Sequence, residues 1–293
     1  MPHVMKPYWL KKNSLLPPAT SPAIALLNRL NLHTICEETI CPNRGECFNH
    51  RMVTFLILGD ICTRHCRFCA VAHGEPLPVD AGEPERIAAA IKELGIKHVV
   101  VTSVTRDDLP DGGSEQFAQV ILAIHECTPG TTVEVLVPDF NGLLSCLDVI
   151  LAAGPEVVGH NIETVRGLYV AIRPEADYAR SLELLAGIKH AGKNILTKSA
   201  LMLGLGETRE AVLQVMADLR TVDCDFLILG QYLQPSQEQY PVLRYVPPTE
   251  FREYEKEALL MGFQAVLSEP FARSSYRADA MLQKAREPIS QLD

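Results

Sequence analysis

The stretch MVTFLILGDICTRHCRFCAV, residues 52–71, joins an apolar run to a cluster of cysteines. The run, residues 52–58, is typical of a strand that is buried on both faces of a parallel sheet. Three cysteines with CxxxCxxC spacing follow it, at Cys62, Cys66 and Cys69. Because functional groups of α/β folds gather at the carboxyl ends of parallel strands, the stretch predicts a reactive metal site at that edge of a sheet.

The number of cysteines in this cluster bears on the kind of metal. Structural zinc sites close a shell of four ligands, whereas reactive centres keep one coordination position open. A zinc knuckle on Cys66 and Cys69, completed by Cys62 and by His65 or His73, stays open as an alternative. Such knuckles normally pair two CxxC units and this chain has one, so the spacing favours an iron–sulfur cluster with an open iron.

Runs like residues 52–58 recur along the middle of the chain. Five more potential strands lie at residues 98–103, 132–137, 156–162, 194–202 and 225–231. Amphipathic helical patterns lie between them, such as EPERIAAAIKELG at residues 83–95, whose final glycine suits a helix C-cap. Six strand-and-helix units predict an α/β fold, a partial (β/α)6 TIM-type barrel, with a doubly wound sheet as the alternative.

The two ends of the chain do not repeat this unit. We therefore expect residues 1–50 to form an N-terminal extension, residues 51–245 the barrel and residues 246–293 a C-terminal extension, with both extensions packed on the barrel. A chain of 293 residues that is 47% hydrophobic is long enough to bury a core of this size.

Composition limits the classes of function. The net charge is −9 and the basic residues are scattered, which argues against a nucleic-acid-binding protein. The sequence shows no apolar run of membrane-spanning length and no secretory signal pattern, so we expect a soluble, cytoplasmic protein with no membrane partner. In a reducing cytosol, the six cysteines from Cys36 to Cys69 are better explained as metal ligands than as disulfides. Isolated cysteines such as Cys146 and Cys224 suit plain packing.

The cysteine cluster has a counterpart in a known superfamily. Cys62, Cys66 and Cys69, with Phe68 just before the third cysteine, resemble the signature of the radical S-adenosylmethionine (SAM) enzymes, whose fold is a partial or full (β/α) barrel. The resemblance implies a [4Fe-4S] cluster whose open iron binds the amino and carboxylate groups of SAM. It also implies that an electron from the cluster cleaves SAM to a 5′-deoxyadenosyl radical. Unactivated C–H bonds lie beyond the reach of side-chain bases, so such bonds require cofactor radical chemistry.

A second group of three cysteines lies upstream, in CEETICPNRGEC at residues 36–47. Taken alone, Cys36, Cys41 and Cys47 suit a zinc loop or unliganded loop cysteines as well as they suit a second cluster. Together with the blocks VTSVTRDDLPDGG, GHNIETV, LTKSALMLGLGET and RSSY, they make nearly the whole chain resemble the lipoyl synthase family.

This second resemblance implies a reaction. Lipoyl synthases insert two sulfur atoms, at C6 and C8, into an octanoyl chain that is amide-linked to a lysine of a lipoyl carrier protein. The resemblance assigns a second, auxiliary [4Fe-4S] cluster to Cys36, Cys41 and Cys47, and this cluster is consumed as the sulfur source. The nearest alternative is a two-cluster enzyme in the manner of biotin synthase, against which the second cysteine group and RSSY argue. An iron–sulfur electron carrier or a zinc-stabilised binding module is disfavoured by the six-unit barrel.

The family assigns the fourth ligand of the auxiliary cluster to the serine that precedes tyrosine in RSSY, which is Ser275 here. Its oxygen is a hard ligand on an iron otherwise held by sulfur, so this bond should break most easily when the cluster loses iron. The alternative is that the segment caps a helix, because residues 276–286 have a helical pattern and serine is a common N-cap. If Ser275 is the ligand, the tail must fold back over about 230 residues to meet residues 36–47.

Polar residues that follow the strands are candidates for contacts with SAM. Together with Phe68, the candidates are Ser103, Thr105, Arg106, Asp107, Asn161, Glu163, Arg173 and Lys198. Residues 103–107 follow the second strand, although a plain polar turn explains them nearly as well. Asn161 and Glu163 share one side of their strand by alternation and suit hydrogen bonds to a ribose.

Three residues in later segments leave alternatives open. Arg173 and Lys198 suit carboxylates of either the cofactor or the protein itself. His160 suits a hydrogen-bonded core histidine better than a metal ligand. The GLGET segment, residues 204–208, lacks the third glycine of a dinucleotide fingerprint and predicts a tight turn between strand and helix.

The resemblance to lipoyl synthases also implies partners. The expected substrate is an octanoylated lipoyl carrier protein or domain, either the glycine-cleavage H protein or the E2 subunit of a 2-oxoacid dehydrogenase. A ferredoxin- or flavodoxin-type protein is the expected electron donor. We expect no nucleic-acid partner and a monomeric enzyme.

Overall fold

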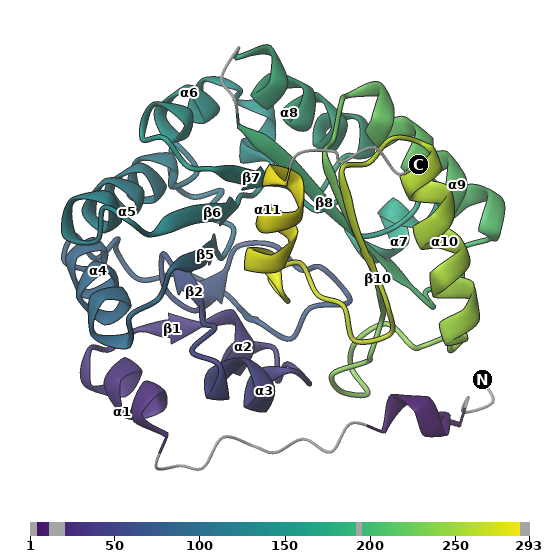
Figure 1. The fold of residues 1–293 in the computed structure, drawn as a ribbon, viewed down its shortest axis with the longest axis horizontal. Helices are drawn as coiled ribbons and strands as arrows, with labels where there is room; N and C mark the ends of the chain where they lie inside the picture. The colour runs from purple at the N-terminus through teal and green to yellow at the C-terminus, as the bar shows by residue number, and fades with distance from the viewer. Residues whose placement is uncertain (1–4, 12–20, 192–194, 288–293) are drawn as a thin grey trace.

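A computed structural model describes residues 5–11, 21–191 and 195–287 of the chain. Its main feature is one curved sheet in the order β1-β2-β5-β6-β7-β8-β9-β10 (Figure 1). The strands are β1 (His33–Thr34), β2 (Thr54–Ile57), β5 (His98–Ser103), β6 (Thr132–Leu136), β7 (Val157–Gly159), β8 (Leu196–Leu203), β9 (Phe226–Gln231) and β10 (Ala265–Ser268). β1 is antiparallel to β2, and all the other neighbours are parallel. Among the described residues no pairing joins β1 to β10, so the barrel is open.

Helices lie around the outside of the sheet (Figure 1). They are α4 (Glu83–Leu94), α5 (Ser114–Cys127), α6 (Ser145–Ala152), α8 (Tyr178–His190), α9 (Arg209–Thr221) and α10 (Pro248–Leu260). One of them follows each of the six strands β2, β5, β6, β7, β8 and β9, which confirms the predicted partial (β/α)6 barrel.

The structure extends this barrel beyond the predicted boundary at residue 246. α10 and β10 continue the alternation, and β10 pairs in parallel with β9. β10 has only four residues, one of them a serine, which is too short an apolar pattern to stand out in the sequence. Residues 248–268 therefore fell within the predicted C-terminal extension, residues 246–293. Parts of both predicted extensions, residues 1–4, 12–20 and 288–293, lie outside the described ranges.

Short elements make up the rest of the described chain. They are η1 (Tyr8–Leu10), α1 (Pro22–Arg29), α2 (Ile35–Glu38), α3 (Arg44–Asn49), β3 (Ile61–Cys62), β4 (Ala72–His73), η2 (Phe140–Gly142), η3 (Arg166–Leu168), α7 (Tyr169–Ile172) and α11 (Ala278–Arg286). Within these ranges no helix has both the length and the apolar character needed to cross a membrane.

Local signals explain where the outer helices begin and end. α4 ends at Gly95, which has a φ of 66° and closes the helix in the left-handed conformation that glycine adopts most easily. α9 begins after Thr208, whose side chain accepts a hydrogen bond from the Ala211 N–H (3.2 Å). This cap follows the GLGET turn directly and confirms the predicted strand-to-helix junction there.

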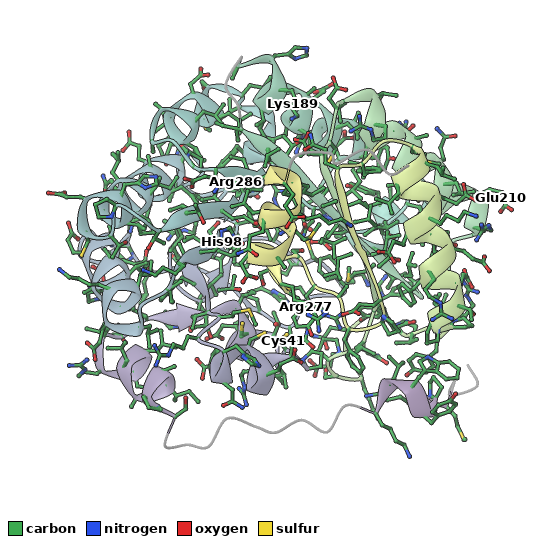
Figure 2. All side chains as sticks on the ribbon, in the orientation of Figure 1. Cys41, His98, Lys189, Glu210, Arg277 and Arg286 are labelled. Atoms are coloured by element: carbon green, nitrogen blue, oxygen red, sulfur yellow. The ribbon has the colours of Figure 1, made fainter. Side chains whose placement is uncertain are left out.

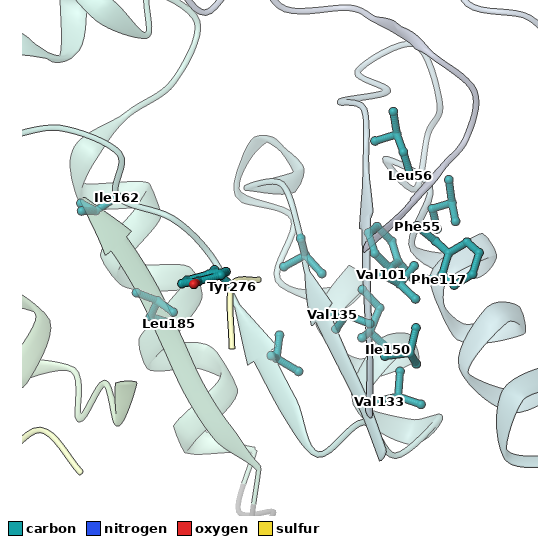
Figure 3. Close-up of a cluster of buried hydrophobic side chains, with 14 of the residues drawn as sticks. Phe55, Leu56, Val101, Phe117, Val133, Val135, Ile150, Ile162, Leu185 and Tyr276 are labelled. Carbon is teal, nitrogen blue, oxygen red and sulfur yellow. The ribbon is translucent and has the colours of Figure 1, made fainter. Parts of the chain in front are cut away.

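The main core lies between the sheet and the outer helices. Phe55 in β2, Val101 in β5 and Val135 in β6 are all completely buried, as is Phe117 in α5. Figure 3 shows Phe117 beside Phe55 and Val101. Fully burying a side chain of this size is worth about 1.5–3 kcal/mol, so this layer holds the helices against the strands.

The C-terminal helix α11 lies in the interior of the open barrel (Figure 1). Its buried residues Met281 and Leu282 pack with Val157, Ala200, Phe226, Ile228 and Ala265 of the last four strands. α11 thus occupies part of the space that the curved sheet encloses.

Candidate active site

The CxxxCxxC cysteines lie in the loop that follows β2, at the carboxyl end of the sheet. Cys62 is the last residue of β3, and Cys66 and Cys69 follow in the loop. Backbone hydrogen bonds tie this loop to three other segments: Thr63 N–H to Thr105 O (3.0 Å), Arg67 N–H to Ile172 O (2.8 Å) and Tyr240 N–H to Arg67 O (2.8 Å). The loop is therefore positioned by the last residue of α7 and by residues that follow β5 and β9.

A cavity of about 580 Å³ opens beside these cysteines. Both cysteine groups contribute to its wall, through Cys36, Cys41, Cys62, Cys66 and Cys69. The wall also contains these predicted SAM contacts: Phe68, Ser103, Thr105, Asn161, Glu163 and Arg173. The structure thus brings most of the predicted cofactor residues to one cavity.

Three polar atoms of this wall are buried without a hydrogen-bond partner among the described residues. They are Ser103 Oγ, Asn161 Oδ1 and Arg173 Nε. Leaving such an atom unpaired costs about 1–3 kcal/mol, so their presence in one cavity indicates a polar ligand. A hydroxyl, an amide oxygen and a guanidinium N–H together suit the hydroxyl, amino and carboxylate groups that SAM carries. The residues present therefore fit this cofactor.

Arg173 is buried beside the cysteine loop. Its Nη1 donates to the carbonyl oxygen of Asn161 (3.1 Å) and to the hydroxyl of Tyr169 (3.0 Å). Burial raises the pKa of the Cys66 thiol to about 11, against the opposing charge of Arg173, and raises the pKa of the Cys69 thiol to about 12. Only a metal charge would make these thiols thiolates at neutral pH, so iron binding here releases protons.

The sulfur of Cys62 has a different environment. It accepts hydrogen bonds from the backbone N–H groups of Thr105 (3.3 Å) and Arg64 (3.5 Å). Hydrogen bonds to ligand sulfurs help to set the reduction potential of an iron–sulfur cluster. The turn between Cys62 and Cys66 is thus suited to a redox-active cluster.

Arg64 is a residue that the sequence analysis missed. Its buried guanidinium donates to Asp107 through Nε (2.7 Å) and Nη2 (2.9 Å), and to the fully buried Asp139 (2.6 Å). It therefore fixes the cysteine loop to the residues after β5 and β6. The sequence does show an arginine between Cys62 and Cys66. The spacing of the motif alone, however, does not predict which carboxylates that arginine will pair with.

Three predicted SAM contacts pair with the protein instead and do not line the cavity. The contacts are Asp107 with Arg64 (2.7 Å), Arg106 with Asp108 (2.8 Å) and Lys198 with Glu134 (2.6 Å). The sequence left open whether Lys198 pairs with a carboxylate of the cofactor or of the protein. In the structure its partner is the protein's own Glu134. The physical reason is burial, because Arg106 and Lys198 are almost completely inaccessible and need a partner close by.

His160 has partners at both ring nitrogens, as the sequence analysis expected of a core histidine. Nδ1 lies 2.8 Å from the Val137 carbonyl oxygen, and Nε2 lies 3.0 Å from Ser181 Oγ. Burial lowers its pKa to about 4.

The second cysteine group lies between two cavities. Cys36 is in α2, Cys41 follows that helix and Cys47 is in α3. All three line a second cavity of about 420 Å³ together with Ser275, and all but Cys47 also line the first cavity. Figure 2 shows Cys41 near the end of α11 at which Arg277 is labelled. Burial raises the pKa of the Cys36 thiol to about 12, so this thiol too would need a metal to ionise at neutral pH.

Zinc ions and iron–sulfur clusters place their protein ligands differently. In the described parts of the chain, no three His, Cys, Asp or Glu side chains are arranged to hold a single metal ion. A zinc ion would need its ligands within about 2.0–2.3 Å of one point. In a cubane cluster each thiolate binds a different iron, so the ligands stand farther apart.

The RSSY segment, residues 273–276, folds back onto the second cysteine group. Tyr276 Oη donates to Glu46 Oε1 of α3 (2.7 Å), across 230 positions of sequence. The predicted return of the tail is therefore confirmed. The N-cap of α11 is Arg277 and makes no side-chain cap hydrogen bond, so the helix-capping alternative for Ser275 is wrong. Ser275 instead faces both cavities.

Comparison with known proteins agrees with this geometry. The model of the radical SAM superfamily matches residues 56–219. The chain is 51% identical over 283 residues to the lipoyl synthase of Caldanaerobacter subterraneus subsp. tengcongensis, with 97% of this chain and 99% of the relative covered. It is 50% identical over 284 residues to the lipoyl synthase of Thermus thermophilus, with 96% and 88% covered.

Solved structures support the fold alone. Methylornithine synthase superposes with a TM-score of 0.53 at 14% identity, over 85% of this chain and 82% of that one. SuiB from Streptococcus suis, solved with S-adenosylmethionine bound, gives a TM-score of 0.57 at 13% identity, over 77% and 53% of the two chains.

Proposed function

Because the chain belongs to the lipoyl synthase family within the radical SAM superfamily, we propose that its two cysteine groups serve the two halves of one sulfur insertion. The reaction is the insertion of two sulfur atoms, at C6 and C8, into a protein-bound octanoyl-lysine to give lipoyl-lysine. Its cofactors are two [4Fe-4S] clusters and SAM. When bound, one cluster supplies the electron that cleaves SAM and the other supplies sulfur.

The first cluster belongs to Cys62, Cys66 and Cys69 in this proposal. In a cubane cluster these three thiols would leave one iron without a protein ligand, and all three cysteines line the cavity of about 580 Å³. The unpaired atoms of Ser103, Asn161 and Arg173 are free to bind polar groups of SAM there. Among the described residues, Arg106, Asp107 and Lys198 are engaged with the protein and are left out of this binding role.

The second cluster belongs to Cys36, Cys41, Cys47 and Ser275. Their shared cavity supports this assignment, as does the return of the tail through Tyr276. A serine oxygen on one iron makes that iron the easiest to remove. The residues thus combine three firm ligands with one weak ligand, as a cluster that must give up sulfur requires.

The observation that carries the proposal is the first cavity itself, because both cysteine groups open onto it. A substrate chain bound in this cavity would lie beside residues of both groups. Between the groups the wall is mainly apolar, as the hydrocarbon of an octanoyl chain requires. The apolar residues include Leu56, Phe68, Leu136, Leu201, Met202 and Ile228.

The partners follow from this chemistry. The substrate is an octanoylated lipoyl carrier domain. We propose the glycine-cleavage H protein or a 2-oxoacid dehydrogenase E2 subunit as its source, a ferredoxin- or flavodoxin-type electron donor, and a monomeric enzyme. We also propose a cytoplasmic location, which is supported by nine cysteines that form no disulfide.

Anaerobic purification followed by metal analysis tests the proposal. About eight irons and eight sulfides per chain are expected for two cubanes, together with conversion of an octanoyl-lysine carrier domain to the lipoyl form when SAM and a reductant are added. Zinc in place of iron, or SAM cleavage without any sulfur in the carrier, would contradict the proposed function.

A further inference from the structure

The side-chain amide of Asn161 connects the wall of the first cavity to the RSSY segment. Its Nδ2 donates to Glu163 Oε1 (2.9 Å) and to Ser274 Oγ (2.7 Å). Its Oδ1 is buried in the wall of the first cavity and has no partner among the described residues. Burial raises the pKa of the Glu163 carboxyl, whereas the charges of Arg173 and Arg273 and the hydrogen bond from Asn161 favour its ionised form. The ionised carboxylate only accepts hydrogen bonds, which fixes the orientation of the amide. The side of the amide that is left for a ligand is therefore an acceptor.

Ser274 stands next to Ser275, the proposed iron ligand. Adjacent Cα atoms are about 3.8 Å apart, so whatever holds Ser274 also limits where the Ser275 oxygen can lie. The other flank of the segment is held by Tyr276, through its hydrogen bond to Glu46 of α3. One anchor of Ser275 thus belongs to the cavity proposed for SAM, and the other belongs to the helix that carries Cys47.

We propose that Ser274 is a positioning residue that couples SAM binding to the bond between Ser275 and the auxiliary cluster. A donor group that reaches Asn161 Oδ1 polarises the amide and strengthens its Nδ2 hydrogen bonds. The hydrogen bond to Ser274 then tightens and keeps Ser275 in place for its iron. When the cavity is empty, this anchor weakens and Ser275 moves more freely. The inference rests on the proposed function, because it requires both clusters.

Coupling of this kind is reciprocal, so the auxiliary cluster must also tighten the binding of SAM. The experiment measures the dissociation constant of SAM by equilibrium dialysis, with cluster-loaded protein that has not been reduced and therefore cleaves nothing. Four proteins form a cycle: the unsubstituted chain, Ser274→Ala, the triple variant Cys36→Ala, Cys41→Ala and Cys47→Ala that lacks the auxiliary cluster, and the combination.

Loss of the auxiliary cluster is expected to weaken SAM binding about fivefold when Ser274 is present, and to leave it unchanged when Ser274 is alanine. If Ser274 contacted SAM directly, Ser274→Ala would instead weaken SAM binding by the same factor with and without the auxiliary cluster. Equal effects in the two backgrounds would overturn the coupling.

A spectroscopic signature and a conservative variant complete the test. Addition of SAM should change the Mössbauer spectrum of the auxiliary cluster in the unsubstituted chain and in Ser274→Thr, which keeps the hydroxyl, but not in Ser274→Ala. An unchanged spectrum in all three proteins would also overturn the inference.

The two levels of hypothesis fail in different ways. A chain that holds only one cluster, or that holds two and makes no lipoyl product, contradicts the proposed function. A chain with two clusters and normal product formation, but without SAM coupling, contradicts only the role of Ser274.

Discussion

Ser275 is the residue on which the second site depends most. Its three proposed co-ligands are cysteines within one short segment, whereas Ser275 comes from the opposite end of the chain. The serine oxygen is a harder ligand than the cysteine sulfurs, and so it holds its iron differently. Replacing that oxygen by sulfur therefore tests whether a weak bond is needed at this position.

We expect Ser275→Cys to retain the auxiliary cluster and near-normal formation of 5′-deoxyadenosine, but to lose sulfur transfer by about tenfold or more. An additional barrier of about 1.4 kcal/mol for releasing the iron suffices for a tenfold loss. Single-turnover assays that count 5′-deoxyadenosine and lipoyl product in the same sample measure both quantities. If Ser275→Cys or Ser275→Ala made lipoyl product at the parent rate, Ser275 would have no role as a ligand and Ser274 would become the better candidate.

His160 should make the stability of the protein depend on pH. Burial lowers its pKa to about 4 in the folded chain, whereas an unfolded histidine titrates near 6.5. Below about pH 6.5, His160 binds a proton in the unfolded chain but stays neutral in the folded chain. The free energy of unfolding therefore falls as the pH decreases toward 4. At 1.36 kcal/mol per pKa unit, the full effect is about 3 kcal/mol.

Urea unfolding of the unsubstituted chain and of His160→Gln, at several pH values from about 7 down to about 5, measures this dependence. The variant should be less stable at neutral pH and should lose less stability on acidification. Cluster loss in acid affects both proteins and cancels in the difference. Parallel pH profiles would show that the protonation of His160 does not differ between the folded and unfolded chains.

The residue scale also marks the limit of reading a site from sequence. The cysteines could be predicted because metal ligands come in characteristic spacings. Asn161 and Glu163 both line the cavity, although they lie beyond the end of β7, and their contact with SAM stays a prediction. Long charged side chains such as Arg106 and Lys198 were less predictable, because each reaches whichever carboxylate the fold brings near.

Among the elements, α11 links the interior of the barrel to the auxiliary site. Its apolar face packs inside the barrel through Met281 and Leu282, and residues 273–276 with their two serines lie just before it. Loss of packing at α11 should therefore reach the auxiliary site before it reaches the loop of Cys62, which other segments hold.

Leu282→Ala should cost about 2–5 kcal/mol of unfolding free energy, because the side chain is only 3% exposed and its removal leaves a cavity. The variant should also lose auxiliary iron faster than iron from the first cluster. Leu260→Ala in α10 is the matched control, since that leucine is 73% exposed and should change stability by less than about 0.5 kcal/mol. Urea unfolding and timed iron release to a chelator are the measurements, and equal effects of the two substitutions would contradict the role of α11.

The strands could be predicted where the apolar run in the sequence had the same length as the strand that forms. The run at residues 132–137 matches β6 almost residue for residue, and residues 225–231 match β9. In contrast, the run at residues 156–162 overestimates β7, which ends at Gly159. The helical pattern of α11 was visible, but an amphipathic pattern does not say which surface the helix will cover.

At the scale of the whole molecule, the first cavity reaches both cysteine groups. Two clusters held by these separate groups would make radical formation and sulfur donation separate functions of one chain. Removing one cluster should therefore remove one function and leave the other measurable.

Replacing Cys62, Cys66 or Cys69 by alanine should abolish 5′-deoxyadenosine under reducing, anaerobic conditions, because the thiols of the SAM-cleaving cluster are lost. Replacing Cys36, Cys41 or Cys47 should leave some unproductive cleavage and no sulfur insertion. Product analysis by mass spectrometry separates these outcomes, and Cys224→Ala serves as a control on a cysteine that packs in the core far from either motif in sequence. Retained cleavage in any variant of the first group would refute its assignment.

The long return of the tail has a consequence for the order of biosynthesis. A ribosome releases Cys36 to Cys69 first, and about 200 residues later it releases Ser275. At ~5–20 residues per second, this interval lasts roughly 10 to 40 s. During that time the growing chain can already present the three thiols of the first motif, but it lacks the oxygen that completes the second ligand set. The sulfur-donating site is thus the last to be completed. Chains arrested in translation before residue 275 should therefore not assemble a complete auxiliary cluster.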